Sequence, residues 1–348
     1  MANAKHNKKR FKGIITILIL IVLVATSVVM IEKEPKAPRS GQVNQPAINQ
    51  NGEPLGELLM TMIDVGQADS FLFEQKGKVA VIDCGTRSTG KDVVSYLKGK
   101  GITRIDYLIG THPHEDHMGG MYAVLTSFDI GTVIIPKVTK SEITTNWYTK
   151  LMGELSSGKY DVQYSEVGHE YTLGQAKMKI IGPITEPDDE NLNNYSIVMK
   201  VSFGDMDVIM TGDAEEQVEK EILQSGADLD AEMLKVGHHG SQTSTSDAFL
   251  DEIDPDYALI SAKVGNKYDH PMPATMAKLE ARNIEVYRTD EQGNVVITIT
   301  AKKITFNCTP GDYQSGTQLA ESSKKGGWLI WKASLPLTAS RAISLSLK

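Results

Sequence analysis

The sequence predicts an α/β domain that follows one apolar segment near the amino terminus. From residue 58 onward, short apolar runs of strand length alternate with stretches in which apolar residues recur at the helical period. Ahead of them, residues 13–31 form one uninterrupted apolar run. Many short strands with helices spread among them favour sheets that are covered by helices.

Residues 13–31 carry no charge and are long enough to cross the roughly 30 Å hydrocarbon core of a membrane. Basic residues precede the run and Glu32 and Glu34 follow it, so the positive-inside rule places residues 1–12 in the cytoplasm as a basic tail. We expect a transmembrane anchor; a cleaved signal segment is the alternative, because it has the same basic-then-apolar pattern. Either interpretation puts the remaining chain outside the cytoplasm, as a single-pass protein of the cell membrane or as a secreted one.

The remaining chain divides into three regions. Residues 32–57 hold four prolines and many Asn, Gln and Gly, which predicts a flexible linker. Residues 58–307 hold the expected strands and helices. Residues 308–348 show neither strand alternation nor an amphipathic helix, so we expect an appended tail of unknown structure.

The expected strands are the short apolar runs, and Phe203-Gly204-Asp205 between two of them predicts a hairpin turn. These runs lie at residues 58–65, 78–85, 105–112, 132–137, 177–183, 195–203, 206–213, 232–239, 256–261, 286–290 and 295–300. The expected helices lie at residues 90–100, 119–127, 144–156, 214–224, 245–252 and 274–282.

Composition limits the class of protein. Of the 348 residues, 41% are hydrophobic and 23% are charged, which supplies one ordinary core and excludes a wholly disordered chain. Cys84 and Cys308 are too few for a disulfide framework. Residues 1–12 carry five basic residues, which leaves 31 basic and 44 acidic residues, a charge of −13, in the rest. Such an acidic body would need a local positive site, such as bound metal ions, to handle a polyanion.

Residues 105–120, IDYLIGTHPHEDHMGG, place metal-binding groups on a loop after an expected strand. Imidazole and carboxylate are the ligands that suit zinc and similar divalent ions. His112 and His114 have the i, i+2 spacing that turns both to one side of an extended loop. Asp116 and His117 lie one bend further on and are better placed for a second ion. Surface histidines on a loop are the alternative interpretation.

Other histidines and acids also stand at the ends of expected strands. Six of the eight histidines fall in three places, the loop described above, LKVGHHGS and KYDHP, whereas a chance scatter would not gather them at strand ends. Asp213 closes MDVIMTGD and Asp83 follows KVAVI. Asp213 has an alternative interpretation as the N-cap of the helix that follows it.

The motif THPHEDHMGG resembles the signature of the metallo-β-lactamase fold, an αββα sandwich that holds one or two metal ions between two sheet edges. The resemblance covers about residues 59–305. In order, the blocks MIDVGQADSFLF, VIDCG, NNYSIVMKVSFG, MTGD, LKVGHHGSQTS and YDHP are similar to the hydrolase domain of ComEC-family competence proteins. Similar blocks occur in secreted phosphorylcholine esterases.

This resemblance implies a site for two divalent ions, with Zn²⁺ expected and Mn²⁺ as the alternative. It implies that His112 and His114 bind the first ion, that Asp116, His117 and His239 bind the second, that Asp213 bridges both, and that Asp83 orients the ligands from behind. Many family members place another histidine ahead of the bridging aspartate. This chain reads ENLNNYSIV there and offers Asn194 and Ser196, which we expect to contact substrate or water.

Two ions that share a water suit the hydrolysis of a phosphodiester, because they activate the water and neutralise the substrate. The candidate catalytic residues are Asp116, Asp213, His238 and His270, and the candidate substrate-binding residues are Asn194, Ser196, Lys235 and Ser241. Lys235 has an alternative interpretation as a strand-edge charge, and Ser241 as a turn residue. We expect His238 to face the substrate and His239 to bind metal, since neighbours on an extended segment point to opposite sides.

The sequence thus favours a membrane-tethered, extracytoplasmic binuclear metallohydrolase, a phosphodiesterase or nuclease linked to DNA uptake or processing. A hydrolase of choline-bearing wall polymers is the first alternative, and a non-catalytic metal-binding domain that contacts an envelope partner is the second. The expected partners are a phosphodiester substrate, DNA or wall polymer, and the membrane through residues 13–31; no obligate protein partner is inferred. The motifs GxSxG and GxxxxGK[ST] are absent from the sequence.

Overall fold

The computed structural model describes residues 54–138, 143, 145–187 and 191–324. The expected tail at 1–12, the segment 13–31, most of the linker and residues 325–348 lie outside the described residues. Among the residues that are described, no helix has the length and apolar character needed to cross a membrane.

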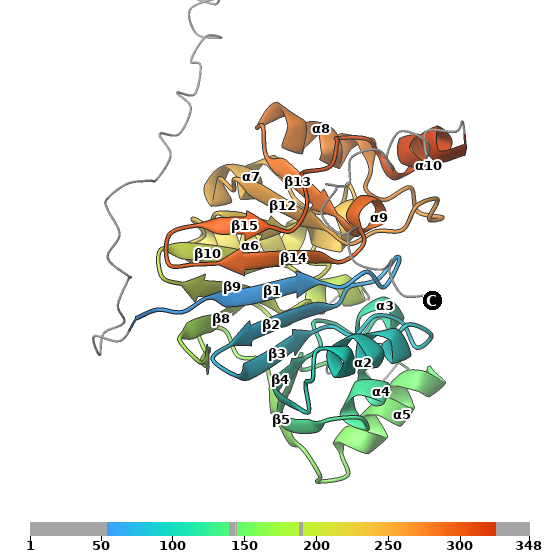
Figure 1. The fold of residues 1–348 in the computed structure, drawn as a ribbon, viewed down its shortest axis with the longest axis vertical. Coiled ribbons are helices and arrows are strands. Elements are labelled where there is room, and N and C mark those ends of the chain that lie inside the picture. Colours follow the sequence, from blue (N-terminus) through green and yellow to red (C-terminus); the bar gives the residue numbers. More distant parts are fainter. Residues whose placement is uncertain (1–53, 139–142, 144, 188–190, 325–348) are drawn as a thin grey trace, which may run out of the picture. The chain divides into compact units, whose positions relative to one another are not determined.

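The first sheet has eight strands in the order β15-β14-β1-β2-β3-β4-β5-β6 (Figure 1). Its strands are β1 (Leu58–Met62), β2 (Phe71–Gln75), β3 (Lys78–Ile82), β4 (Arg104–Ile109), β5 (Asp129–Ile135), β6 (Asp161–Tyr164), β14 (Val295–Ile299) and β15 (Ile304–Phe306). β1 pairs antiparallel with β14, so segments far apart in the sequence lie side by side. β3, β4, β5 and β6 are parallel, and their carboxyl ends therefore meet at one edge.

The second sheet has seven strands in the order β13-β12-β11-β10-β9-β8-β7. Its strands are β7 (Glu170–Leu173), β8 (Ala176–Gly182), β9 (Val198–Phe203), β10 (Met206–Met210), β11 (Met233–Lys235), β12 (Tyr257–Ile260) and β13 (Glu285–Arg288). β10 to β13 are parallel, whereas β9 and β10 form the predicted hairpin. Gly204 turns this hairpin at φ 65°, a conformation that glycine adopts without steric cost.

Side-chain alternation along the strands separates a central core from two outer ones. In β3, Ile82 joins the core between the sheets while Val81 packs under helices; in β10, Met210 and Ile209 divide in the same way. The helices that contribute to the outer cores are α2 (Gly90–Gly99), α4 (Met121–Leu125) and α5 (Asn146–Leu155) over the first sheet, and α6 (Glu216–Ser225), α7 (Asp247–Ile253) and α8 (Pro273–Ala281) over the second. This layering agrees with the predicted αββα arrangement.

Each expected strand overlaps an observed one, but β2, β6, β7 and β15 are additional. Three of the four lie at sheet edges, where few side chains are buried and the apolar signal is weak. The fourth, β2, is a short internal strand whose apolar run FLF spans only three residues.

The expected tail from residue 308 onward is wrong for residues 308–324, which pack on the domain. The backbone N–H of Gly311 donates to Val286 O at 2.7 Å, and the Tyr313 hydroxyl donates to Ile284 O at 2.9 Å. Helix α10 (Gly316–Lys324) follows, and the N–H of Gly316 donates to Pro271 O at 2.9 Å. Such docking rests largely on main-chain hydrogen bonds, which leave no apolar pattern in the sequence.

Candidate metal centre

Loops that follow five parallel strands carry the expected functional side chains. The carboxyl ends of parallel strands share an edge, so the loops after β3 and β4 gather at one edge of the first sheet and those after β10, β11 and β12 at one edge of the second. The two edges meet at the site, where His117 Nε2 lies 3.2 Å from Asp213 Oδ2. The loop after β3 carries Asp83, that after β4 His112 and His114, that after β10 Asp213, that after β11 His238 and His239, and that after β12 His270.

Asp116 and His117 lie in a single helical turn, α3 (Glu115–Met118), and not in the loop that the sequence predicted. His114 is its N-cap residue, with extended backbone. Two hydrogen bonds fix the turn: the N–H of Asp69 donates to Asp116 O at 3.1 Å, and that of Cys84 donates to His117 O at 2.8 Å. These bonds present the two side chains toward the second sheet.

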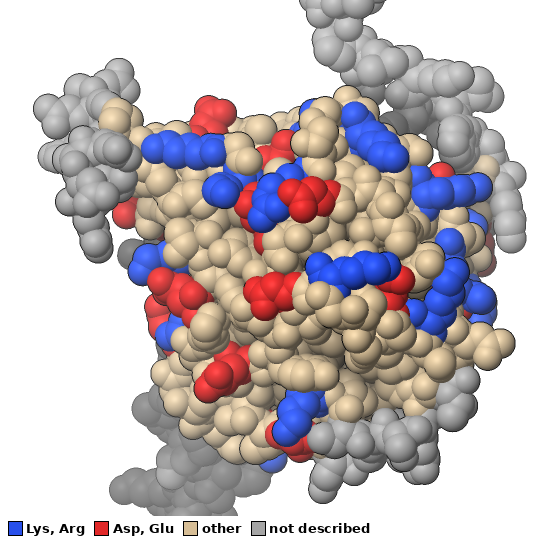
Figure 2. Space-filling model, turned by 90° about the horizontal axis from the view of Figure 1, so that it is seen from below, with Lys and Arg blue, Asp and Glu red and all other residues tan. Residues whose placement is uncertain are grey.

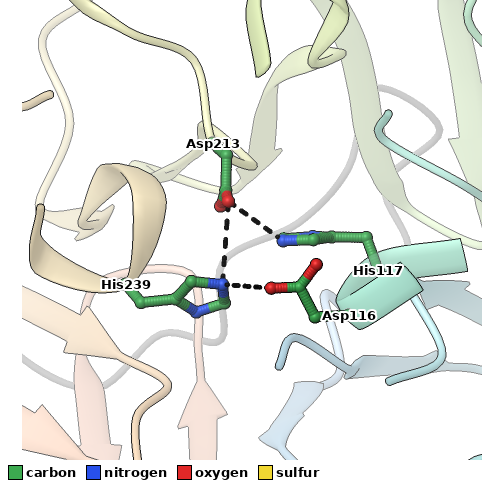
Figure 3. Close-up of side chains that lie close together, drawn as sticks. All are labelled: Asp116, His117, Asp213 and His239. Atoms are coloured by element: carbon green, nitrogen blue, oxygen red, sulfur yellow. Dashed lines mark ion pairs between the residues drawn. The ribbon is translucent and has the colours of Figure 1, made fainter. Parts of the chain in front are cut away.

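Asp116, His117, Asp213 and His239 point toward one another (Figure 3). One ligand atom from each lies within 4.8 Å of the others. Asp213 Oδ2 is 3.2 Å from His117 Nε2 and 3.7 Å from His239 Nε2, and Asp116 Oδ2 is 3.5 Å from His239 Nε2. The structure therefore brings together the residues expected at the second ion and the expected bridging aspartate.

The donor atoms of this group fit a divalent metal ion. His117 Nε2, His239 Nε2 and both carboxylate oxygens of Asp213 are buried and have no hydrogen-bond partner within the described part of the chain. Buried polar atoms normally have one, so a common ligand is indicated. Ligand atoms around tetrahedral zinc lie about 3.3 Å apart, close to the spacings seen here.

The ligand side chains are oriented from behind. The His239 Nδ1–H donates to Ser261 O at 3.0 Å, which leaves Nε2 for the metal group. His117 Nδ1 lies 2.8 Å from Asp83 Oδ2, and Asp83 also accepts from Thr111 N at 2.8 Å. Such contacts fix the orientation of metal-binding imidazoles. Asp83 thus lies behind the His117 ring, and its role in orienting a metal ligand stays a prediction.

The charges of the group are strongly coupled. Burial lowers the pKa of His239, but Asp213 and Asp69 outweigh it and raise this pKa to about 10. Burial alone would raise the pKa of Asp213, yet His117 and His239 hold it well below its usual range. The carboxylates are therefore ionised, as metal ligands must be, and a cation that binds here displaces protons from the imidazoles.

Of the expected ligands of the first ion, His112 lies beside the same aspartate and His114 lies beside His112. His112 Nε2 is 3.0 Å from His114 Nδ1 and 3.9 Å from Asp213 Oδ2. Burial lowers the pKa of His112 well below its usual range, so its imidazole is neutral and keeps a lone pair for a metal.

The expected extended backbone at His238 and His239 is wrong. The two residues form a left-handed turn with φ 49° and 55°, a conformation that costs energy in non-glycine residues and clusters at functional sites. Both Nε2 atoms consequently lie 3.7 Å from Asp213 Oδ2. Exposure separates them instead: 25% of the His238 side chain is accessible to solvent, against 2% of His239.

Glu215 contacts His238, the more accessible of the two histidines, a role that the sequence did not indicate. Its Oε1 lies 3.4 Å from His238 Nδ1 and accepts from Asn193 Nδ2 at 2.9 Å and Thr243 Oγ1 at 3.1 Å. Burial would raise the pKa of Glu215, but the hydrogen bonds to it lower this pKa to about 2. Glu215 is also the N-cap residue of α6, so the alternative interpretation of Asp213 as that cap is wrong.

Comparison with known proteins agrees with this architecture. Residues 63–262 match the metallo-beta-lactamase superfamily. The chain belongs to this superfamily. It is 30% identical to ComE operon protein 3 of Bacillus subtilis (strain 168) over 76% of the chain and 35% of that protein. It is 29% identical to Competence protein ComA of Neisseria gonorrhoeae over 69% of the chain and 32% of that protein.

A third relative is Recombination protein 2 of Haemophilus influenzae, 29% identical over 67% of the chain and 28% of that protein. The chain thus spans about a third of the length of these curated relatives. The predicted relationship to the ComEC-family competence proteins is confirmed for this superfamily domain.

Two predicted substrate contacts of this superfamily domain are wrong. Lys235 is fully buried, with Nζ 2.9 Å from Asp69 Oδ2 and donating to Val236 O at 2.8 Å. It is therefore neither a substrate contact nor the strand-edge charge of the alternative interpretation. Ser196 is also buried, and its Oγ accepts from the N–H of Asp213 at 3.0 Å. It holds the loop of the expected bridging ligand.

Ser241 and Asn194 are not among the residues that line the pocket over the metal group. Ser241 Oγ accepts from the N–H of Thr243 at 3.3 Å, which agrees with the alternative interpretation as a turn residue, and its contact with substrate stays a prediction. Asn194 borders an open hollow next to Glu215 and Thr243. Contact of Asn194 with substrate stays a prediction.

A pocket of about 230 Å³ opens over the metal group. It is lined by Gln67, His114, Glu115, Asp116, Asp213, His238, His239, Tyr268 and His270. Burial and the neighbouring His238 and His239 lower the pKa of His270 to about 4, so this imidazole is neutral near pH 7. Asp69, Gln67, Glu215 and Tyr268 were not predicted; Asp69 and Gln67 lie in the block MIDVGQADSFLF, whose resemblance was the available signal.

Proposed function

We propose that the chain is a binuclear metallohydrolase that cleaves phosphodiesters, with DNA as the substrate, and that it acts in DNA uptake or processing. The observation that carries this proposal is the group of Asp116 with the buried His117, Asp213 and His239, which opens into a pocket lined by three further histidines, His114, His238 and His270. The similarity to competence proteins supports DNA as the substrate.

The ions, when bound, supply a water of lowered pKa and positive charge against the phosphate. Asp213, next to both sets of histidines, would hold both ions, with His112 and His114 on the first and the other three ligands on the second. During hydrolysis, an oxygen from water bonds to phosphorus while the bond to the leaving oxygen breaks, and that oxygen takes up a proton.

His238 is placed to supply this proton when its ring is protonated, because Glu215 holds Nδ1 and Nε2 lies near Asp213 in the pocket. His270 is neutral near pH 7 and acts through hydrogen bonds, not as the acid. On the face shown in Figure 2, basic and acidic side chains are interspersed, so this face offers no broad basic surface that would attract DNA. Bound ions provide the local positive charge instead.

The test uses the full chain in detergent, stripped of metal and then loaded with Zn²⁺ or Mn²⁺. We expect close to two ions per chain, and hydrolysis of single-stranded DNA and bis-p-nitrophenyl phosphate. Hydrolysis of p-nitrophenyl phosphorylcholine alone would favour the wall-polymer alternative. Metal binding without turnover of any of the three would favour the non-catalytic alternative.

We also propose that residues 13–31 tether this domain outside the cytoplasm, as their uncharged run and basic flank indicate. A reporter that fluoresces only in the cytoplasm should stay dark when fused after Lys348. The same reporter fused ahead of residue 1 should be bright. A bright carboxyl-terminal fusion contradicts this topology.

The paired histidines should differ in what their loss removes. His239→Ala should lower metal content and turnover together, because a buried member of the metal group is lost. His238→Ala should keep both ions and lose roughly 10²-fold in turnover, the scale of a positioned proton donor. Bound metal measured by mass spectrometry beside DNA hydrolysis separates the two. The assignment is reversed when His238→Ala strips metal and His239→Ala does not.

A further inference from the structure

Tyr268 is a half-exposed aromatic residue at the pocket over the metal group. Its side chain lines that pocket together with Asp213 and His238, yet 51% of the residue is accessible to solvent. An aromatic ring at the rim of a polar site offers an apolar face to whatever extends out of the site. This ring has no part in the hydrolytic step described above.

The loop that carries Tyr268 is held in one conformation. Asn266 Oδ1 accepts from the N–H of Tyr268 at 3.0 Å and from that of His270 at 3.1 Å. Asn266 Nδ2 in turn donates to Lys263 O at 2.9 Å. The Tyr268 ring stacks on the His270 ring, with centroids 5.6 Å apart and planes inclined by 25°.

The carboxyl-terminal segment braces the same loop. Asp269 accepts hydrogen bonds from the N–H and the hydroxyl of Thr317, at the start of α10. The N–H of Gly316 donates to Pro271 O at 2.9 Å. The ring is therefore presented by a fixed loop, which limits the entropy that a ligand must remove on stacking.

The charge beside the ring distinguishes the chemical class of the ligand. Lys267 Nζ lies 4.7 Å from the Tyr268 ring centroid, and Lys263 is exposed on the same loop. An aromatic face beside exposed ammonium groups suits a base that is flanked by phosphates. A quaternary ammonium would meet a cation already over the ring, which disfavours choline.

The pocket is too small to hold a whole nucleotide, so part of the ligand must lie outside it at the rim. About 230 Å³ is less than the roughly 300–1,000 Å³ of typical small-molecule sites, so the pocket takes the phosphodiester and leaves its flanking groups outside. Those groups then lie beside Tyr268.

We propose that Tyr268 is a stacking platform for a nucleobase next to the scissile phosphate, and that the substrate is single-stranded nucleic acid. This inference rests on the proposed phosphodiesterase function. An arriving base covers the ring while the ammonium of Lys267 moves to a neighbouring phosphate. Bases in a duplex are stacked on one another and offer no free face, which accounts for the preference for single strands.

A binding measurement tests this proposal independently of catalytic turnover. Fluorescence anisotropy of the full chain in detergent, in EDTA at low salt and again with Zn²⁺, compares a labelled eight-residue oligothymidylate with an abasic oligomer of equal length. Tyr268→Ala should weaken binding of the oligothymidylate by about 5- to 150-fold, the range for the loss of one stacked base, and leave the abasic oligomer unchanged. Tyr268→Trp should restore binding.

Tyr164→Ala is the matched control, because Tyr164 is 55% exposed on the edge strand β6 and should not affect either oligomer. Equal weakening of both oligomers by Tyr268→Ala, no weakening, or no binding by the unaltered chain overturns the proposal. So does Tyr268-dependent competition by phosphocholine, which would assign the ring to choline. Base-dependent binding through Tyr268 without hydrolysis refutes the proposed function alone.

Discussion

Asp213→Ala is expected to remove both divalent ions from the protein and to lower phosphodiester turnover by at least about 10³-fold. Asp213 Oδ2 lies within 3.9 Å of nitrogen atoms from His112, His117 and His239, so one carboxylate lies beside ligands expected for each of the two proposed ions. His114→Ala should remove less metal, because its ring lies beside His112, with Nδ1 3.0 Å from His112 Nε2, and is expected to bind the first ion only.

The measurement is the metal content of the purified full chain by mass spectrometry, beside hydrolysis of bis-p-nitrophenyl phosphate. Asp213→Asn keeps the size of the side chain and tests whether the negative charge is the property that matters. Asp92→Ala removes an exposed carboxylate from α2 and should change neither quantity. Equal metal loss from Asp213→Ala and His114→Ala would contradict the bridging role.

The sequence predicts those members of the site that directly follow an apolar strand. Asp213 closes the run that becomes β10, and the signature histidines follow the run that becomes β4. Parallel pairing then carries such residues to one edge of each sheet. His112 and His117 reach the edge of the first sheet in this way, and Asp213 and His239 that of the second, but the meeting of the two pairs depends also on how the sheets pack together.

The remaining features depend on contacts that no local pattern encodes. His238 and His239 form a left-handed turn, in which side chains do not alternate between two sides as they do along a strand. The expectation of opposite-facing side chains therefore does not apply to the observed backbone. Residues 308–324 dock through hydrogen bonds to β13 and to the loop ahead of α8, and the edge strands β6 and β7 bury little. Each of these depends on tertiary structure.

The buried pair of Lys235 and Asp69 is the largest such omission. Asp69 lies in the irregular segment between β1 and β2, and its partner is 166 positions further along the chain. Both side chains are almost wholly buried, and their charged atoms are 2.9 Å apart. Asp69 also lies 3.3 Å from His239 Nδ1, which couples the pair to the metal group.

Lys235→Met is therefore expected to lower the free energy of unfolding by about 3–5 kcal/mol, because it breaks a buried ion pair and leaves Asp69 with only the imidazoles of His239 and His117 as charged neighbours. Urea denaturation of the full chain in detergent, with EDTA present, measures this without a contribution from bound metal. Lys78→Met is the matched control: Lys78 Nζ lies 3.0 Å from Asp106 Oδ1, but 55% of its side chain is exposed. Its loss should cost about 1 kcal/mol or less.

Adding Asp69→Asn to Lys235→Met should recover a large part of the lost free energy, because the second change removes the buried charge that has lost its lysine. That recovery distinguishes electrostatics from packing, since a cavity or clash left by methionine would persist in the double variant. A loss from Lys235→Met no larger than that from Lys78→Met would contradict the account. So would additive effects of Lys235→Met and Asp69→Asn, because residues in direct contact should show a coupling energy.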